Sequence, residues 1–175
     1  TNPSARYSTN GGVINIVTGS GPVAGEALVT HPDVAMTSFT GSTAVGRRIM
    51  AMAAQTAKRV HLELGGKAPC LVFDDADVEA AAHGAVAGAI INGGQDCTAA
   101  TRAYVQAPLF DAFTARVAEL MDAVVVGDPT DPDTDLGSLI SHAHRDKVAG
   151  FVNRARESGA RILAECYARS GDDWG

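Results

Sequence analysis

The feature that most constrains this chain is the alternation of short, mostly apolar runs with helix-periodic segments. Six runs are consistent with buried strands, at 13–17, 34–39, 60–64, 70–73, 102–106 and 161–164. Helical patterns separate most of them, at 24–31, 40–57, 78–90, 108–125 and 141–158. Strands that alternate with helices in this way predict an α/β fold.

Composition narrows the class of function. The 175 residues carry a net charge of −6, which argues against nucleic acid or an anionic membrane surface as partner, because both attract cationic proteins. No run approaches the roughly 18 apolar residues that a membrane-spanning helix requires. The three cysteines, Cys70, Cys97 and Cys166, are widely spaced without a CxxC motif. The cysteine pattern favours a protein of the reducing cytoplasm. The negative net charge favours a small molecule as its ligand.

A change in composition at the segment LELGGKAP (62–69) predicts a boundary between two partial domains, 1–65 and 66–175. In the first, the strands at 13–17, 34–39 and 60–64 are expected to share one sheet, with helices between them. In the second, the aspartates of DDAD (74–77) suit the start of a helix, since acidic side chains cap and complement a helix N-terminus.

One cysteine stands in a small, polar loop. The segment GGQDCTAATR (93–102) follows a helix-stop signal, and Cys97 has neighbours too small to cover it. Structural cysteines are usually buried among apolar side chains, whereas reactive ones are partly exposed. We therefore interpret Cys97 as a nucleophile.

Glu63 is the candidate base. Period-two alternation in VHLEL places His61 and Glu63 on one face of a strand, with Leu62 and Leu64 on the other. A carboxylate at the end of a strand, followed by two glycines, can reach into a cleft and serve as a general base for a nearby thiol's chemistry. The alternative is a solvated glutamate at a sheet edge.

Two glycine-rich turns follow predicted strands. GSGPVAG (19–25) is one residue too long for the dinucleotide pattern GxGxxG, so an ordinary turn competes with a nucleotide site. The spacing of Gly41 and Gly46 fits a phosphate loop, but Arg47-Arg48 replaces its Lys-Ser/Thr pair and excludes a Walker site. A phosphate at the following helix N-terminus and simple capping by Ser42 or Thr43 both remain open.

The remaining polar clusters predict no metal site. Leu136 and His142 occupy the glycine and glutamate places of a calcium loop that would begin at Asp131. The five histidines lack a recognisable ligand spacing. None has the local context of a cysteine-protease base, which keeps hydrolysis a minor alternative.

Four ordered motifs together resemble the aldehyde dehydrogenase superfamily: FTGSTAVG (39–46), LELGGKAP (62–69), FDDADVEAA (73–81) and GQDCTAATR (94–102). The resemblance runs from about Gly12 to Leu163, and its last motif is most similar to the aminobutyraldehyde and betaine-aldehyde dehydrogenases. It implies the end of a Rossmann-like cofactor domain in 1–65 and the first part of an α/β catalytic domain in 66–175. The segments TNPSARYSTN and CYARSGDDWG at the two ends do not resemble the family.

The resemblance also implies the site. Cys97 would attack the aldehyde, and its N–H would help to bind the oxyanion. Glu63 would activate the water that hydrolyses the resulting thioester. The residues expected at the cofactor are Gly41, Ser42, Gly46, Leu64 and Gly65. The expected reaction oxidises an aldehyde to a carboxylic acid with NAD, NADP staying open, and an aminoaldehyde such as 4-aminobutanal is one candidate substrate.

The family's chain is much longer. Segments of the PWN, KPxE and EIFGP types, which supply a second oxyanion donor and ribose contacts, have no counterpart here. We therefore expect an internal fragment that is inactive alone, from a parent that is a homo-oligomer. Two alternatives are a non-catalytic remnant that binds a longer relative, and a thiol esterase that uses Cys97 without a cofactor.

Overall fold

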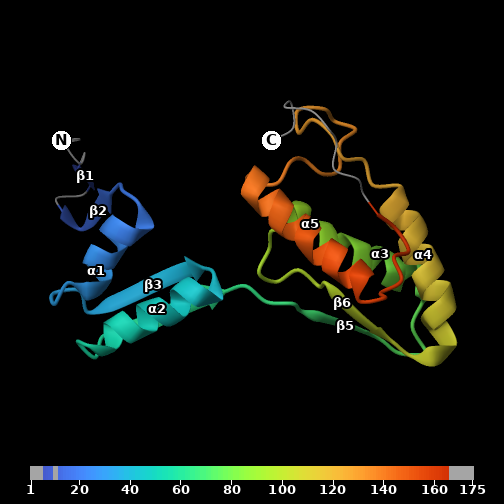
Figure 1. Ribbon diagram of the computed structural model, residues 1–175, viewed down its shortest axis with the longest axis horizontal. Coiled ribbons are helices and arrows are strands. Elements are labelled where there is room, and N and C mark those ends of the chain that lie inside the picture. The colour runs from blue at the N-terminus through green and yellow to red at the C-terminus, as the bar shows by residue number, and fades with distance from the viewer. Residues whose placement is uncertain (1–5, 10–11, 166–175) are drawn as a thin grey trace. The chain divides into compact units, whose positions relative to one another are not determined.

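The computed structural model describes residues 6–9 and 12–165, and these form two compact units that divide between Gly65 and Gly66 (Figure 1). Both mix helices with strands, which confirms the predicted α/β class. That these units are parts of a cofactor domain and a catalytic domain stays a prediction. No helix in the described ranges has both the length and the apolarity needed to cross a bilayer.

The first unit is built on a β-α-β arrangement. Its strands and helices are β1 (Arg6–Thr9), β2 (Ile14–Val17), the π-helical turn η2 (Gly21–Gly25), α1 (Glu26–Thr30), β3 (Met36–Gly41), α2 (Thr43–Ala54) and β4 (Arg59–Leu64). Strands β3 and β4 pair in parallel, with Thr40 opposite Glu63 and Gly41 opposite Leu64. The carboxyl ends of the two strands therefore meet at the N-terminus of α2, where α/β proteins commonly bind ligands.

Alternation in β4 decides which of its faces is covered. Val60, Leu62 and Leu64 are half-buried, while Arg59, His61 and Glu63 are exposed. Helix α2 packs on the half-buried face through Gly46, Ile49 and Ala53. The opposite face, which carries Glu63, has no helix of the described unit on it.

The prediction that the strands at 13–17, 34–39 and 60–64 share one sheet is wrong for the first of them. Strand β2 pairs antiparallel with β1, Ile14 opposite Thr9, and not with β3. A strand needs a hydrogen-bonded neighbour, and Arg6–Thr9 offers one after a very short connection, which has a low entropic cost of closure. The residue pattern of this segment does not predict a strand.

The second unit pairs β5 with β6 and packs helices together beside them. Its strands and helices are β5 (Pro69–Val72), α3 (Val78–Ile90), the 3₁₀ turn η3 (Ile91–Gly94), β6 (Arg102–Val105), the 3₁₀ turn η4 (Ala107–Leu109), α4 (Phe110–Asp122) and α5 (His142–Glu157). Its core joins Val72, Ala82, Ala85 and Phe113 from β5, α3 and α4. Figure 1 shows α3 and α4 side by side.

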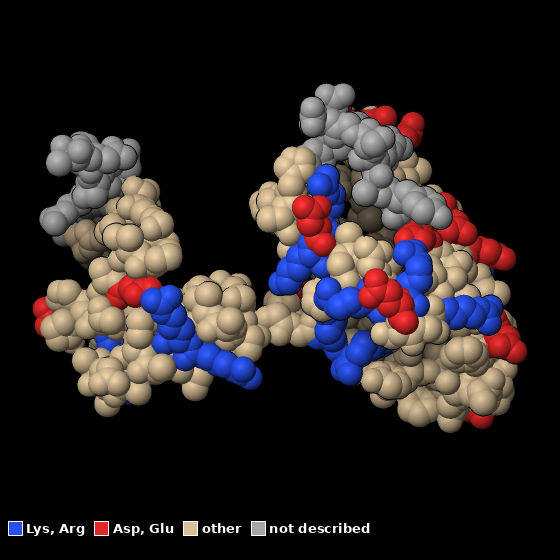
Figure 2. Space-filling model, in the orientation of Figure 1, with Lys and Arg blue, Asp and Glu red and all other residues tan. Residues whose placement is uncertain are grey.

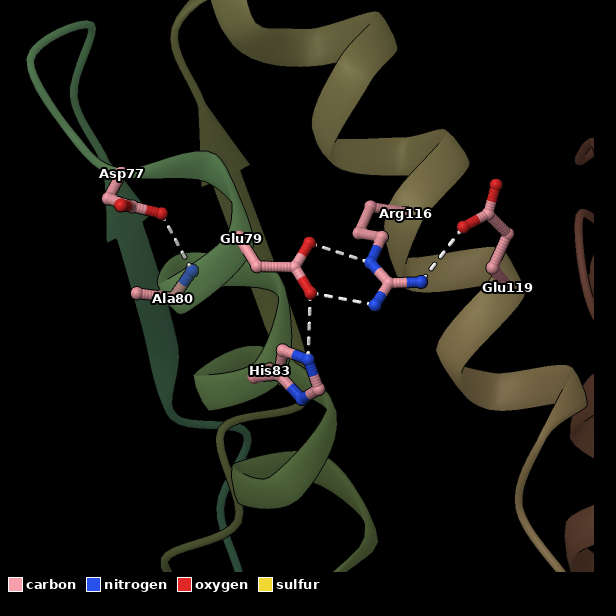
Figure 3. A network of polar contacts seen from close by, with 6 residues as sticks. All are labelled: Asp77, Glu79, Ala80, His83, Arg116 and Glu119. Atoms are coloured by element: carbon pink, nitrogen blue, oxygen red, sulfur yellow. Dashed lines mark hydrogen bonds and ion pairs between the residues drawn. The ribbon is translucent and has the colours of Figure 1, made fainter.

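Polar contacts also join α3 to α4 (Figure 3). Asp77 caps α3 by accepting the Ala80 N–H at 2.9 Å, as the acidic lead-in predicted. Both oxygens of Glu79 accept hydrogen bonds at 2.7 Å from the Arg116 guanidinium on α4. Arg116 and, to a lesser extent, a hydrogen bond from His83 lower the pKa of Glu79 to about 2.

The predicted strand at 161–164 is wrong. Residues 161–165 carry no regular structure, and no described strand pairs with them. The segment is attached through its end instead, where both oxygens of Glu165 accept hydrogen bonds from Arg156 at 2.7 Å. An apolar run without a ladder partner gains nothing from extended pairing, so its composition alone does not make it a strand.

Many large apolar side chains are exposed in both units. Val13 and Ile140, for example, are each 83% exposed. Figure 2 shows a viewed face that is mostly uncharged, with basic and acidic side chains interspersed over the second unit. Two-stranded sheets bury apolar surface only where a helix covers them, which leaves the other faces and edges open.

Candidate active site

Cys97 lies between η3 and β6, and its side chain is exposed as the sequence predicted. Three successive residues before it adopt left-handed backbone conformations: Asn92 (φ 50°), Gly93 (φ 64°) and Gly94 (φ 74°). Asparagine and glycine tolerate this region better than other residues. The chain thus turns sharply at the end of α3 and presents the thiol on a short loop.

Hydrogen bonds hold this loop on both sides of Cys97. One Asp96 oxygen accepts the Thr98 N–H at 2.6 Å and the Thr98 hydroxyl at 2.7 Å. The hydroxyl, followed by the N–H, lowers the pKa of Asp96 below its ordinary value. The Ala100 N–H donates to the Gly88 carbonyl of α3 at 2.9 Å, and the absence of a side chain at Gly88 permits this approach.

The backbone of Cys97 itself is available for a ligand. Its N–H has no hydrogen-bond acceptor among the described residues. Its carbonyl points toward Gly66, where a β-carbon would lie 3.4 Å from the oxygen. An unpaired N–H beside an exposed thiol is an arrangement that can stabilise the oxyanion formed on a carbonyl oxygen when the sulfur bonds to the carbonyl carbon.

Gln95 ties the loop to the chain before α5. Its Oε1 accepts the Ile140 N–H at 3.0 Å, and its Nε2 donates to the Asn92 carbonyl at 3.1 Å. A local pattern does not identify Gln95 as a support of the loop, because its partner Ile140 lies 45 positions away in the sequence. The one sequence feature that points to a role for Gln95 is its position in the GQDC motif, two residues before Cys97.

The cofactor candidates lie together in the first unit, where β3 and β4 end. Ser42 caps α2 by accepting the Val45 N–H at 3.3 Å on its hydroxyl. The N–H groups of Thr43 and Ala44 have no acceptor in the described part of the chain. Capping by Ser42 is thus observed, and two free N–H groups at the same helix end can still bind a phosphate.

Close packing explains why glycine stands at positions 41 and 46. A β-carbon at Gly41 would meet the Phe39 ring, its Cε1 at 2.9 Å. A β-carbon at Gly46 would lie 2.7 Å from Leu64 Cδ2. These glycines therefore allow the turn and α2 to approach their neighbours closely.

A pocket of about 470 Å³ lies beside this turn, between α1 with its lead-in turn η2 and helix α2, over β3. Its lining is mostly apolar and includes Pro22, Gly25, Phe39, Val45, Ile49 and Met52. An ion pair between Glu26 and Arg48 also borders it. The GSGPVAG turn contributes Gly21, Pro22 and Gly25 to the pocket, and α2 contributes Val45, Ile49 and Met52.

Glu63 is exposed at the end of β4, and His61 Nε2 lies 3.3 Å from its Oε1. Leu64 faces α2, and Gly65 is the last residue of the first unit. Gly41, Ser42, Gly46, Glu63 and Leu64 are therefore neighbours at one edge of the β3–β4 pair. Cys97 belongs to the other unit, so its pairing with Glu63 stays a prediction.

In the acidic loop that resembles a calcium loop, aspartate side chains accept hydrogen bonds from residues of the loop itself. Asp128 accepts hydrogen bonds from the Thr130 N–H and hydroxyl, and Asp131 accepts one from the Asp133 N–H at 3.0 Å. Within residues 6–9 and 12–165, no three His, Cys, Asp or Glu side chains gather as metal ligands would. Cys166 lies outside the described residues.

Comparison with known proteins identifies the family. The aldehyde dehydrogenase family pattern matches residues 7–175. The chain belongs to the aldehyde dehydrogenase family. The match takes in residues 7–10 and 166–175, so the expectation that the end segments do not resemble the family is wrong for CYARSGDDWG and for the last four residues of TNPSARYSTN.

Related aldehyde dehydrogenases are similar over most of this chain. A betaine aldehyde dehydrogenase of Sinorhizobium fredii is 45% identical over 152 residues, which are 87% of this chain and 31% of the relative. One of Vibrio vulnificus is 44% identical with the same coverage. The chain thus spans about a third of the length of these relatives.

Solved structures show the same fold. Lactaldehyde dehydrogenase of Escherichia coli superposes with a TM-score of 0.89 at 44% identity, covering 93% of this chain and 34% of that one. Betaine aldehyde dehydrogenase of Staphylococcus aureus, solved in complex with NAD⁺, gives 0.83 at 37% identity, covering 86% and 30%. The α/β aldehyde dehydrogenase architecture is confirmed.

Proposed function

We propose that this chain provides the nucleophile, the hydrolytic base and part of the dinucleotide site of an enzyme that oxidises an aldehyde to a carboxylic acid. The observation that carries the proposal is the exposed Cys97 thiol, held on a hydrogen-bonded loop beside its own unpaired N–H. Family membership supports the reaction class.

The first step uses Cys97. Its thiolate forms a bond to the aldehyde carbon, and the carbonyl oxygen becomes an oxyanion that the Cys97 N–H binds. Loss of a hydride from the same carbon leaves a thioester. NAD, when bound, supplies the hydride acceptor. The tied loop contributes orientation, because a thiol held in one place reacts more readily than one that moves freely.

The second step uses Glu63. Its carboxylate takes a proton from water, the water oxygen attacks the thioester carbon, and the carbon–sulfur bond breaks to release the acid and restore the thiolate. This role requires an ionised, solvent-accessible carboxylate, and the Glu63 side chain is 57% exposed. It also requires Glu63 and Cys97 to face one substrate, which is part of the proposal.

The dinucleotide site that we propose lies at Gly41, Ser42, Gly46, Leu64 and Gly65. The free N–H groups of Thr43 and Ala44 suit a phosphate, and the apolar pocket between α1 and α2 suits a flat aromatic base. The NAD⁺ complex of the Staphylococcus aureus relative supports NAD as the cofactor. NADP remains the alternative.

For the substrate we propose an aminoaldehyde such as 4-aminobutanal. The support is the named activity of the betaine aldehyde dehydrogenases, whose substrate also carries a nitrogen near its aldehyde. We further propose a cytoplasmic, homo-oligomeric parent. The 175-residue chain alone is expected to be inactive, since losing even one oxyanion donor lowers the rate roughly 10²–10³-fold.

A chimera tests the proposal. Residues 12–163 replace their counterpart in the Sinorhizobium fredii relative, and reduction of NAD is followed with 4-aminobutanal, betaine aldehyde and lactaldehyde. Cys97→Ser should abolish reduction, and Glu63→Gln should preserve a first burst while slowing later turnovers. Cys70→Ala, a change at a half-buried core cysteine, is the matched control and should remain active. Full turnover in the Cys97→Ser chimera would refute the proposal.

The esterase alternative is tested on the 175-residue chain. Cleavage of p-nitrophenyl acetate without NAD, lost in Cys97→Ser and kept in Cys70→Ala, would support a cofactor-independent thiol esterase. Co-purification with a longer relative, without either activity, would support a non-catalytic binding role.

A further inference from the structure

Three polar side chains form a row on the open face of the β3–β4 pair. Ser38 lies directly opposite His61 in the parallel register. The Ser38 hydroxyl is 3.1 Å from His61 Nδ1, and His61 Nε2 is 3.3 Å from Glu63 Oε1. The imidazole therefore touches a hydroxyl through one nitrogen and the candidate base through the other.

The carboxylate decides which nitrogen carries the proton. An ionised Glu63 can only accept, so the contact is favourable when Nε2 bears the hydrogen. Nδ1 of the neutral ring is then an acceptor, and the Ser38 hydroxyl, which can rotate, donates to it. Ser38 thus stabilises the tautomer of His61 that donates to Glu63.

No other charged group competes for this contact within the described unit. On the same face, β3 contributes Met36 and Thr40 beside Ser38, and neither is ionisable. On β4, Arg59 also lies on this face, two positions before His61 and therefore on the side of His61 away from Glu63. Helix α2 packs on the opposite face of the strands.

We propose that His61 is a positioning residue for Glu63, and that Ser38 fixes the imidazole tautomer that performs this role. The inference rests on the proposed function of Glu63 as the hydrolytic base. An exposed glutamate samples several rotamers, and a donor on the preceding same-face residue holds its carboxylate in one of them. A base oriented by a third group is a recurring arrangement in nucleophilic catalysis.

The tautomer is testable without activity. In the 175-residue chain, ¹⁵N chemical shifts of His61 at a pH where the ring is neutral should show hydrogen on Nε2 and a bare Nδ1. Ser38→Ala and Glu63→Leu should each move these shifts toward a tautomer mixture, while Arg59→Gln should not. A wild-type ring with hydrogen on Nδ1 would overturn the inference, whatever the fate of the proposed enzyme activity.

The positioning role is tested by separating the two chemical steps. In the active chimera, His61→Leu should slow thioester hydrolysis about tenfold, below the roughly 10²–10⁴-fold that a general base contributes. The burst of NAD reduction should keep its rate, because acylation does not use Glu63. His61→Gln, whose amide can donate from a similar position, should restore most of the hydrolysis rate, and Arg59→Gln should equal wild type.

The outcomes separate the two proposals. Hydrolysis unchanged in His61→Leu, or an equal loss in His61→Leu and His61→Gln, would overturn the positioning role while leaving Glu63 as the base. An unchanged rate in Glu63→Gln would instead overturn the base, and the tautomer measurement would then stand as a structural result alone.

Discussion

Leu64 occupies the space that a side chain at residue 46 would need. A β-carbon on Gly46 would lie 2.7 Å from Leu64 Cδ2 and 3.1 Å from Cδ1. The first turn of α2 therefore rests directly on the end of β4, next to Glu63. This contact sets the separation between the proposed phosphate site and the proposed base.

Gly46→Ala should lower the free energy of unfolding by about 1 kcal/mol. The clash costs about 1–3 kcal/mol, and the better helix propensity of alanine offsets about 1 kcal/mol of that. Urea unfolding of the 175-residue chain measures the change. Gly84→Ala in α3, where a β-carbon meets nothing within 4 Å, is the control and should stabilise by up to about 1 kcal/mol. Equal effects at both glycines would contradict the packing argument.

Ser42 allows capping and phosphate binding to be separated. Ser42→Ala removes the hydroxyl that accepts the Val45 N–H, and it should destabilise the chain by about 1 kcal/mol. Ser42→Asp keeps a good capping acceptor but adds a negative charge, so it should preserve stability and raise the KM for NAD in the chimera. Unfolding and steady-state kinetics test the two effects. An unchanged KM in Ser42→Asp would place the phosphate elsewhere.

Glu79 and Arg116 make the stability of the second unit pH-dependent. The pKa of Glu79 is lowered to about 2 from an ordinary 4.5, so its contribution is complete above about pH 4.5 and is lost as the pH falls toward 2. Glu79→Gln should thus be less stable than wild type at pH 7, and the difference should shrink below pH 4.5. Thermal unfolding across that range measures it.

Glu119 provides the comparison for that experiment. The Glu119 side chain is 67% exposed, and its carboxylate accepts one hydrogen bond from Arg116 at 2.9 Å. Exposed single-contact pairs contribute little, so Glu119→Gln should have a smaller effect than Glu79→Gln. The reverse order would show that the two-oxygen contact is not the main link between α3 and α4.

The Asp96–Thr98 contact should control the order of the Cys97 loop. Thr98→Val removes the hydroxyl that contributes most to lowering the pKa of Asp96, whereas Thr98→Ser keeps it. We expect the protection of the Thr98 N–H from hydrogen exchange to fall several-fold in Thr98→Val and in Asp96→Ala, but not in Thr98→Ser. Protection that is equal in all variants would show that the loop is held mainly through Ala100 and Gln95.

Local patterns in the sequence determined much of this chain. Helical periodicity located α2, α3, α4 and α5 to within a few residues, and the acidic and hydroxyl residues before α2, α3 and α5 act as caps. Alternation placed His61 and Glu63 on one face, and small neighbours around Cys97 predicted its exposure. These features depend on residues only a few positions apart, which is why one sequence suffices to predict them.

Only the tertiary structure decided which segments are partners. The contact of Ser38 with His61 and the hydrogen bond between Gln95 and Ile140 join residues 23 and 45 positions apart. The pairing of β2 with β1 and the absence of a strand at 161–164 depended on which strand edges were available. A strand's composition favours extension but does not specify its neighbour. That choice depends on the whole set of available edges, on the entropy of closing each connection and on packing, none of which a local pattern encodes.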